Sequence, residues 1–141
     1  KYFSLNANIS IINSKVELSG IGSTVTNLER RLQGQSPYTI NMGLYYDNSD
    51  LGTSVNLSYN RFGKRISEVG LEGLSDIEEN GRDVVDLSVM QRLFKNFEVK
   101  FTVKDILAQD YLYTQTIAGK EEMFKKINAG TGFSLSLSYK Y

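Results

Sequence analysis

The sequence predicts an all-β fold built from antiparallel strands, and three observations support this class. Six segments alternate apolar and polar residues with a period of two, which places the apolar side chains of each strand on one face. Short and long connections alternate between these segments along the chain. Aromatic residues stand at the ends of the apolar faces, as they do at the two surfaces of a transmembrane β-barrel.

Each of the six expected strands has one apolar face and one polar face. In the first strand Phe3, Leu5 and Ile9 share a face, and Ser4 and Asn6 lie on the other. No charged side chain falls on the apolar face of any segment, whereas the other face carries Ser, Asn, Lys and Glu. The expected strands cover residues 3–11, 38–46, 54–60, 85–90, 97–104 and 133–141.

The composition argues against several functional classes. The chain of 141 residues has the length of one domain, and its 16 basic and 16 acidic residues leave no net charge to attract nucleic acid. Cys and His are absent, which excludes disulfides, thiol nucleophiles, His-based triads and the usual zinc sites. We therefore expect a protein that is not an enzyme, with no catalytic, cofactor-binding or metal-binding residues and no nucleic-acid partner.

The connection lengths favour a transmembrane barrel over a soluble β-sandwich, although both give strands with one apolar face. Long connections at about 12–36, 61–82 and 105–131 alternate with short ones at 47–52 and 94–96. Barrels of the outer membrane have short periplasmic turns and long extracellular loops in this alternation. Six strands cannot close such a barrel, since bacterial examples begin at eight. We therefore expect residues 1–141 to be the C-terminal part of one larger barrel domain.

The aromatic residues have the spacing of a membrane girdle. Tyr38 and Tyr46 bracket the second strand, and Phe133 and Tyr141 bracket the sixth. Eight residues of strand span about 26 Å, which projects to roughly 20 Å at a tilt of about 40° and approaches the apolar band of about 25 Å in such barrels. The lipid-facing girdle predicted from the sequence consists of Tyr38, Tyr46, Tyr59, Phe97, Phe133, Tyr139 and Tyr141.

The polar faces are expected to line the barrel lumen, and one hairpin has a predictable register. A three-residue loop at 94–96, with its Asn in the left-handed conformation, makes the numbers of paired residues sum to 190. This register sets Arg92 opposite Glu98 and Asp86 opposite Lys104, which are two opposite-charge pairs. The predicted lumen-facing side chains are Asn41, Asn56, Asn60, Asp86, Arg92, Glu98, Lys100 and Lys104.

Several short motifs have both a functional and an ordinary interpretation. Residues 20–23 (GIGS) resemble a phosphate-cradling loop and residues 47–50 (DNSD) a calcium loop, but both have the composition of turns. The acidic stretch 72–83 is either a cation-binding or a solvated loop, and its adjacent Glu78 and Glu79 lack the fixed separation of a glycosidase pair. Residues 119–127 have opposite charges at i and i+4. We expect two turns, a solvated loop and one or two helical turns.

Five segments along the chain are similar to one known family. They are residues 32–38 (LQGQSPY), 59–66 (YNRFGKRI), 82–87 (RDVVDL), 103–107 (VKDIL) and 132–139 (GFSLSLSY). Together they resemble the C-terminal barrel region of TonB-dependent outer-membrane receptors, most closely the branch with an N-terminal carboxypeptidase-regulatory-like domain. The chain departs from this branch at 103–107, where the family often has an Asn-Leu-Phe-Asn run, and at Tyr141, where the family usually has Phe.

The resemblance implies a bacterial outer-membrane barrel of about 22 strands, of which this chain supplies the last six. It also implies uptake of a nutrient ligand, with a plug domain and a TonB box that are absent from residues 1–141. The implied partners are membrane lipid, the plug and remaining strands, the TonB energy complex, and the barrel-assembly machinery, which reads Tyr139 and Tyr141. Two alternatives stay open: a barrel that serves secretion or outer-membrane assembly, and a soluble β-sandwich that binds a partner.

Overall fold

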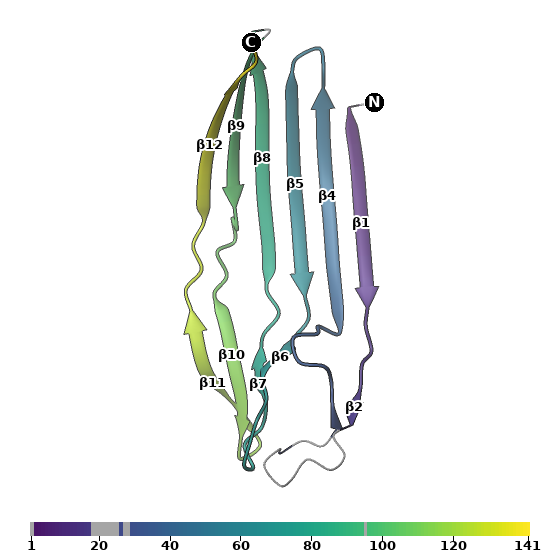
Figure 1. Cartoon of the computed structure of the whole chain (residues 1–141), viewed down its shortest axis with the longest axis vertical. Helices are drawn as coiled ribbons and strands as arrows, with labels where there is room; N and C mark the ends of the chain where they lie inside the picture. The colour runs from purple at the N-terminus through teal and green to yellow at the C-terminus, as the bar shows by residue number, and fades with distance from the viewer. Residues whose placement is uncertain (1, 18–25, 27–28, 95) are drawn as a thin grey trace.

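The computed structural model describes residues 2–17, 26, 29–94 and 96–141, and no helix occurs among them. A large sheet occupies one end of the molecule and smaller sheets occupy the other (Figure 1). In chain order the strands are β1 (Phe3–Ile11), β2 (Val16–Glu17), β3 (Glu29–Arg30), β4 (Tyr38–Asn48), β5 (Thr53–Phe62), β6 (Arg65–Glu68), β7 (Ile77–Glu79), β8 (Asp83–Leu93), β9 (Phe97–Lys104), β10 (Tyr111–Ile117), β11 (Lys120–Ile127) and β12 (Gly132–Tyr139).

The large sheet contains β1, β4, β5, β8, β9 and β12, hydrogen-bonded in this order with every neighbouring pair antiparallel. These strands coincide with the six alternating segments and are neighbours in chain order, so the predicted antiparallel sheet is confirmed. Its short turns, 49–52 and 94–96, lie at one end, and the long connections lie at the other (Figure 1). The sheet is open, with β1 and β12 at its edges.

The register extends the alternation of each strand across the whole sheet. Directly opposed residues of neighbouring strands point to the same side, so a row of partners belongs to one face. One row of the apolar face is Leu5, Leu44, Leu57, Leu87, Val103 and Phe133. The adjacent row on the polar face is Ser4, Tyr45, Asn56, Ser88, Thr102 and Ser134. The sheet therefore has one apolar and one polar surface.

The β8–β9 hairpin has the predicted register, because Arg92 lies opposite Glu98. Asp86 and Lys104 lie one step beyond the last pair of this ladder. Among the described residues neither Arg92 with Glu98 nor Asp86 with Lys104 forms an ion pair. Asp86 instead accepts a hydrogen bond of 2.7 Å from the backbone N–H of Asp105, which directly follows β9.

The loop of this hairpin also differs from the predicted one. The residue in the left-handed conformation is Phe94, with φ of 60°, and not Asn96. The Asn96 side chain donates a 2.5 Å hydrogen bond to the carbonyl oxygen of Lys140, which lies just past β12. The Asn96 side chain thus contacts the end of β12, and Asn96 does not adopt the left-handed conformation expected for the turn.

The long connections contain strands that the alternation did not reveal. A second sheet has the order β11–β10–β7–β6, and β2 pairs with β3 in a two-stranded ladder. The prediction of helical turns at 119–127 is wrong, since these residues form the β10–β11 turn and the strand β11. A bulge between Tyr113 and Thr114 shifts this ladder, and Glu121 pairs with Lys64 across the sheet rather than with Lys125 along a helix. Bulges and charged edge strands both remove the period-two signal.

The buried core of the molecule lies in this second sheet. Ile66 and Ile77 are the buried hydrophobic side chains in the described part of the chain. Glu79 is only 7% exposed, so the prediction of a solvated loop is wrong where the acidic stretch forms β7. The edge of β6 is covered by residues 31–36, where the N–H of Gly34 donates to the carbonyl of Ile66 at 2.8 Å.

Two of the predicted turns have different outcomes. Residues 20–23 lie outside the described residues. At 47–50 the chain leaves β4 and turns, and the side-chain oxygen of Asn48 accepts the N–H groups of Asp50 and Leu51, both at 3.1 Å. This is the Asx geometry for which Asn is favoured in turns, so that turn is confirmed.

Candidate functional site

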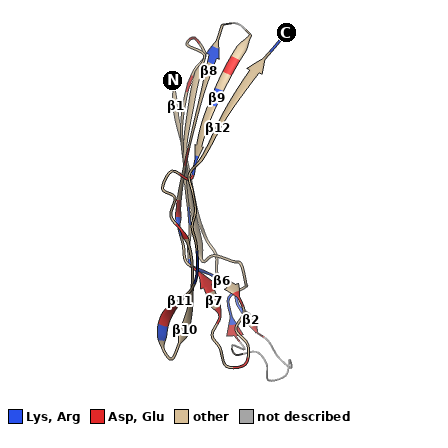
Figure 2. Cartoon of the chain, turned by 90° about the vertical axis from the view of Figure 1, so that its left-hand side faces the viewer, with Lys and Arg blue, Asp and Glu red and all other residues tan. Residues whose placement is uncertain are grey.

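The apolar face of the six-stranded sheet is exposed along its length. Phe3, Leu5, Leu135 and Leu137 are each more than 60% exposed, and central Leu57 is 40% exposed. Viewed edge-on, the sheet is a single layer in the described structure (Figure 2). Such a contiguous apolar surface is unusual for a protein in water and marks a surface that contacts a partner or lipid.

Two lines of aromatic residues cross this face obliquely. Tyr38 on β4 and Phe133 on β12 mark the line near the long connections, and Tyr46 and Tyr139 mark the line near the short turns. Phe133 on β12 can be traced through successive strand partners to Leu44 on β4, which is therefore at the same level of the sheet. Leu44 is six residues from Tyr38. The same registers, extended by a few residues, put Tyr139 four residues from the level of Tyr46.

These displacements measure a strand tilt. Four strand-to-strand steps separate β4 from β12, and both aromatic lines shift in the same direction, by about 1.25 residues per step. At about 3.3 Å per residue and about 4.8 Å between strands, the strands tilt by about 40° from the normal to the lines. Strands of outer-membrane barrels tilt by about 35–45° from the barrel axis.

The line near the short turns is completed by uncharged polar side chains. Thr53 and Gln91 lie opposite each other on the apolar face of β5 and β8. The Thr53 hydroxyl donates to Gln91 Oε1 at 2.6 Å, and Gln91 Nε2 donates to the carbonyl of Leu51 at 2.9 Å. Their polar atoms are therefore paired within the protein, which lowers the cost of placing them beside an apolar surface.

The line near the long connections is completed by an ion pair. Arg61 and Asp83 lie opposite each other on the apolar face, two residues beyond Tyr59 and Val85. Arg61 Nη1 donates to both carboxylate oxygens of Asp83, at 2.6 and 2.7 Å. The Tyr59 hydroxyl donates to the same carboxylate at 2.6 Å. On β5 and β8 the apolar band is thus three residues deep and bounded by polar groups at both ends.

The predicted girdle residues lie on this face, in part as ring contacts between neighbouring strands. Ring centroids are 5.0 Å apart for Phe3 and Tyr46 and 6.3 Å apart for Phe97 and Tyr139. Tyr141 lies beyond the end of β12 and is fully exposed. The sequence-based girdle did not include Arg61 and Asp83. The sequence did contain a signal for them. The period of two, continued past Tyr59, places Arg61 on the apolar face, and the same period before Val85 places Asp83 there.

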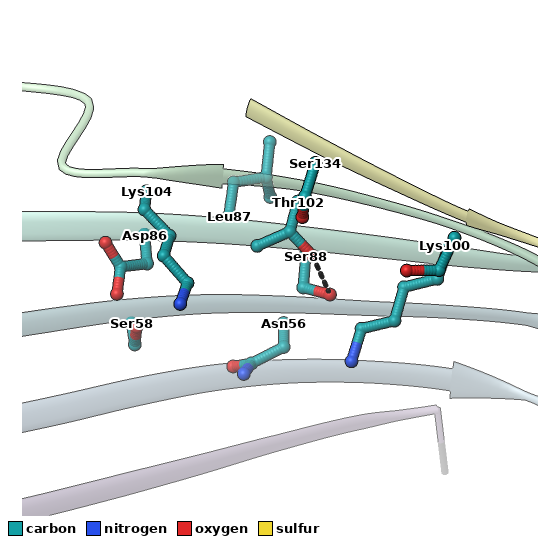
Figure 3. Close-up of a pocket in the computed structure, with 10 residues that line it drawn as sticks. Asn56, Ser58, Asp86, Leu87, Ser88, Lys100, Thr102, Lys104 and Ser134 are labelled. Carbon is teal, nitrogen blue, oxygen red and sulfur yellow. Dashed lines mark hydrogen bonds between the residues drawn. The ribbon is translucent and has the colours of Figure 1, made fainter. Parts of the chain in front are cut away.

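The polar face of the sheet is hollowed between β5, β8, β9 and β12. This hollow has a volume of about 360 Å³, and Lys100 and Lys104 extend into it toward β5 (Figure 3). Neither lysine forms an ion pair among the described residues. Besides the two lysines, the Asp86 carboxylate and Leu87, its lining consists of residues with hydroxyl or amide groups: Asn56, Ser58, Ser88, Thr102, Ser134 and Ser136.

A second hollow of the polar face lies over β1, β4 and β5. Asn8, Asn41 and Asn60 form one row there, and Asn60 Nδ2 donates to Asn41 Oδ1 at 2.6 Å. The ring of Tyr45 lies over Gly43, where an added Cβ would come within 2.8 Å of the ring. The predicted lumen side chains from these strands are therefore brought together on one concave polar surface.

A cluster of ion pairs joins the second sheet. Lys64 Nζ lies 3.0 Å from a Glu78 carboxylate oxygen and 2.5 Å from one of Glu121, and Arg31 reaches Glu78 at 3.4 Å. Burial lowers the pKa of Lys64, but the hydrogen bonds to Glu121 and Glu78 outweigh it and leave this pKa raised. The same hydrogen bond from Lys64, with one from Thr114, lowers the pKa of Glu121. These ion pairs connect the start of β6 with β7 and β11.

Glu78 and Glu79, which the sequence analysis set aside as a glycosidase pair, take part in separate ion pairs. Glu78 takes part in the Lys64 cluster, while Glu79 accepts a 2.8 Å hydrogen bond from Arg65 Nε. As neighbours on β7, the two carboxylates point to opposite faces of the strand. Within the described ranges no group of three or more acidic side chains is arranged to hold a metal ion.

No helix in the described part of the chain is long and apolar enough to span a membrane. Comparisons with protein-family models, with curated proteins and with solved structures find no match to this chain. The two surfaces of the six-stranded sheet therefore carry the functional interpretation.

Proposed function

We propose that the six-stranded sheet is part of the wall of a transmembrane β-barrel in the bacterial outer membrane. The apolar face contacts lipid and the hollowed polar face lines the lumen. The observation that carries this proposal is the pair of oblique aromatic lines, because the strand tilt of about 40° that they define falls in the range of outer-membrane barrels.

The absence of a core in this sheet supports the same proposal. A β-sandwich packs the apolar face of one sheet against a second sheet about 10 Å away. Among the described residues no second sheet covers this face, and the buried hydrophobic side chains, Ile66 and Ile77, both lie in the smaller sheet. Lipid removes the exposed apolar area from water without a second sheet. This favours a membrane wall over a soluble binding module.

For the barrel as a whole we propose TonB-dependent uptake of a nutrient ligand. The support is the resemblance of five segments to receptors of this class, together with a lumen face rich in lysine, asparagine and serine side chains. Such a face suits a lumen filled by a plug domain and water, which form hydrogen bonds with it. The partners in this proposal are lipid, the plug, further strands, the energy complex and the assembly machinery, in the roles that the resemblance implies.

Reconstitution tests the location of the sheet. The protein is expected to require detergent or lipid to remain folded, and in phosphatidylcholine vesicles its strands β5 and β8 are expected to resist added protease. The control is the same protein diluted into buffer without detergent. A monomer that folds there with the same circular dichroism spectrum refutes the membrane wall.

Uptake in cells tests the transport class. Deletion of the protein is expected to abolish uptake of one nutrient, and a protonophore is expected to abolish the same uptake in the unmodified strain. The control is a nutrient that enters through an open porin. Loss of secretion or of outer-membrane assembly on deletion, with uptake unchanged, favours the alternative barrel functions.

A further inference from the structure

The ion pair at the edge of the apolar face is built into a larger cluster. Arg61 Nε donates to the Tyr38 hydroxyl at 3.3 Å, while Arg61 Nη1 and the Tyr59 hydroxyl both bind the Asp83 carboxylate. Gly63 leaves room for the Tyr38 ring, since a Cβ at this position would lie 2.8 Å from its Cε1 atom. Four side chains from β4, β5 and β8 are thus held together on the lipid side.

The cluster has the electrostatics of a group at the boundary between hydrocarbon and water. Arg61 and Asp83 together carry no net charge, and hydrogen bonds from Tyr59 and Arg61 satisfy the carboxylate. Arg61 Nη2 forms no hydrogen bond among the described residues, and the Arg61 side chain is 37% exposed. Its two N–H groups remain free to donate to an acceptor outside the protein, and phosphate oxygens, like carboxylates, match the geometry of a guanidinium.

The position of the cluster matches the aromatic line near the long connections. A line drawn from Tyr38 on β4 to Phe133 on β12 shifts toward the short turns by about 1.5 residues per strand. It crosses β5 and β8 close to Arg61 and Asp83. On β5, eight residues separate Arg61 from Thr53 on the other line. At a tilt of about 40° this interval corresponds to a membrane thickness of about 20 Å, at the thin end for bilayers and in keeping with an outer membrane.

We propose that Tyr38, Tyr59, Arg61 and Asp83 form a headgroup anchor that sets the depth of the sheet in the membrane. In this role Arg61 Nη2 donates to phosphate groups of the lipid layer on the side of the long connections. The inference rests on the proposed membrane wall, and it adds which residues bind the membrane surface and at what level.

Depth measurements test the anchor, and the sequence suits them because it contains no Trp. Ile40→Trp places a probe in the row of Arg61, and Met42→Trp places one on the same face of β4, midway between Tyr38 and Tyr46. Each variant is reconstituted into vesicles that contain phosphatidylcholine brominated either near the carbonyl groups or near the chain ends. The shallow bromines are expected to quench the probe of Ile40→Trp more strongly than the deep ones, and the probe of Met42→Trp is expected to show the reverse order.

The outcomes separate this inference from the proposed function. If neither group of brominated lipids quenches either probe, the apolar face is not in lipid and the membrane wall itself is refuted. If both probes are quenched most strongly by the deep bromines, the face is in lipid but the anchor is not at headgroup level, and only the further inference is refuted.

A double substitution tests whether the cluster sets the depth. Arg61→Leu with Asp83→Leu keeps the net charge and removes the polar boundary, so the sheet is expected to move deeper and the shallow-to-deep quenching ratio at Ile40→Trp to fall about twofold. Lys126→Leu with Asp110→Leu removes a comparable ion pair from the smaller sheet and is expected to leave the ratio unchanged. An unchanged ratio in the first double variant, with β-sheet content retained, overturns the anchor.

Discussion

The two main sheets of this molecule use charge in opposite ways. In the six-stranded sheet one ion pair, Arg61–Asp83, joins described residues of neighbouring strands, and it lies at the edge of the apolar face. In and around the four-stranded sheet, five ion pairs among the described residues connect Arg31, Lys64, Arg65 and Lys126 with Glu78, Glu79, Asp110 and Glu121. Figure 2 shows the same contrast, with most charged residues of the view gathered at the end that holds β6, β7, β10 and β11.

The difference between the sheets follows from the solvent that each is suited to. The smaller sheet buries Ile66 and Ile77 and surrounds them with paired charges, which is a structure that water solvates on its outside. The larger sheet buries no hydrophobic side chain among its described residues and exposes continuous rows of Leu, Val and Phe. Lipid satisfies such rows, whereas water does not. In the proposed barrel, one chain therefore carries one sheet that lies in the membrane and another that lies in water.

The largest expected effect comes from a charge on the apolar face. Leu135→Arg is expected to make folding into membranes less favourable by about 2–4 kcal/mol, because Arg near mid-membrane loses its hydration. Ser136→Arg, the matched control on the next residue, points to the polar hollow and is expected to cost less than about 1 kcal/mol. The measurement is the yield of heat-modifiable folded protein in vesicles. Equal losses for the two variants contradict the assigned facing.

A smaller effect is expected where backbones approach closely at the joint between the sheets. A Cβ on Gly81 would lie 2.3 Å from the carbonyl oxygen of Phe62, so Gly81→Ala must displace backbone. We expect a destabilisation of about 1–3 kcal/mol, as for other overpacked sites. Gly130→Ala is the control, since nothing lies within 4 Å of its Cβ position. Urea titration of both variants measures the difference, and identical midpoints contradict the close approach.

A comparable but local effect is expected from the paired charge in the small sheet. Glu79→Ala leaves Arg65 without its partner 2.8 Å away, at a position where the Glu79 side chain is 9% exposed. We expect a loss of about 1–3 kcal/mol, below the value for a fully buried pair because Arg65 reaches solvent. Hydrogen exchange of the β6 and β7 amides measures it, and Glu72→Ala is the exposed control. Faster exchange in β5 and β8 but not in β7 contradicts this local role.

The smallest effect is a pH dependence confined to the β10–β11 hairpin. The hydrogen bond from Lys126 lowers the pKa of Asp110, and the one from Lys64 lowers that of Glu121. A lowered pKa in the folded state stabilises the fold above the ordinary values of 3.8 and 4.5, and this stabilisation is lost as the pH falls through the folded-state values. Amide exchange in β10 and β11, corrected for its intrinsic rate, is expected to accelerate below about pH 4.

The matched variant for this pH dependence is Glu121→Gln. It removes one titrating carboxylate and keeps the side-chain length, so the acceleration at low pH is expected to decrease. The six-stranded sheet is the internal control, and its central strands β5 and β8 are expected to keep their protection over the same range. Loss of protection in β5 before β10 contradicts the contrast between the two sheets.

Local sequence information was enough to predict the six long strands, their order, their two faces and the β8–β9 register. Alternation of period two is a local property, and a side chain on a strand needs no distant partner to point to one side. The short turns then left one antiparallel order for each hairpin. The same period placed Tyr38, Tyr46 and Phe133 on the apolar face, where they are the outermost apolar positions of their strands.

The second sheet, the polar hollows and the cluster of Arg61 with Asp83 depend instead on contacts between distant parts of the chain. β6, β7, β10 and β11 are short, charged or bulged, so their strand conformation comes from pairing across long separations, as between Arg65 and Glu79 or Tyr113 and Glu79. The expected helix at 119–127 did not form because β11 pairs with β10 along its length, and Glu121 then meets Lys64, 57 residues away in the sequence. Local spacing predicts which face a residue takes, but which charges meet depends on the registers of several ladders together.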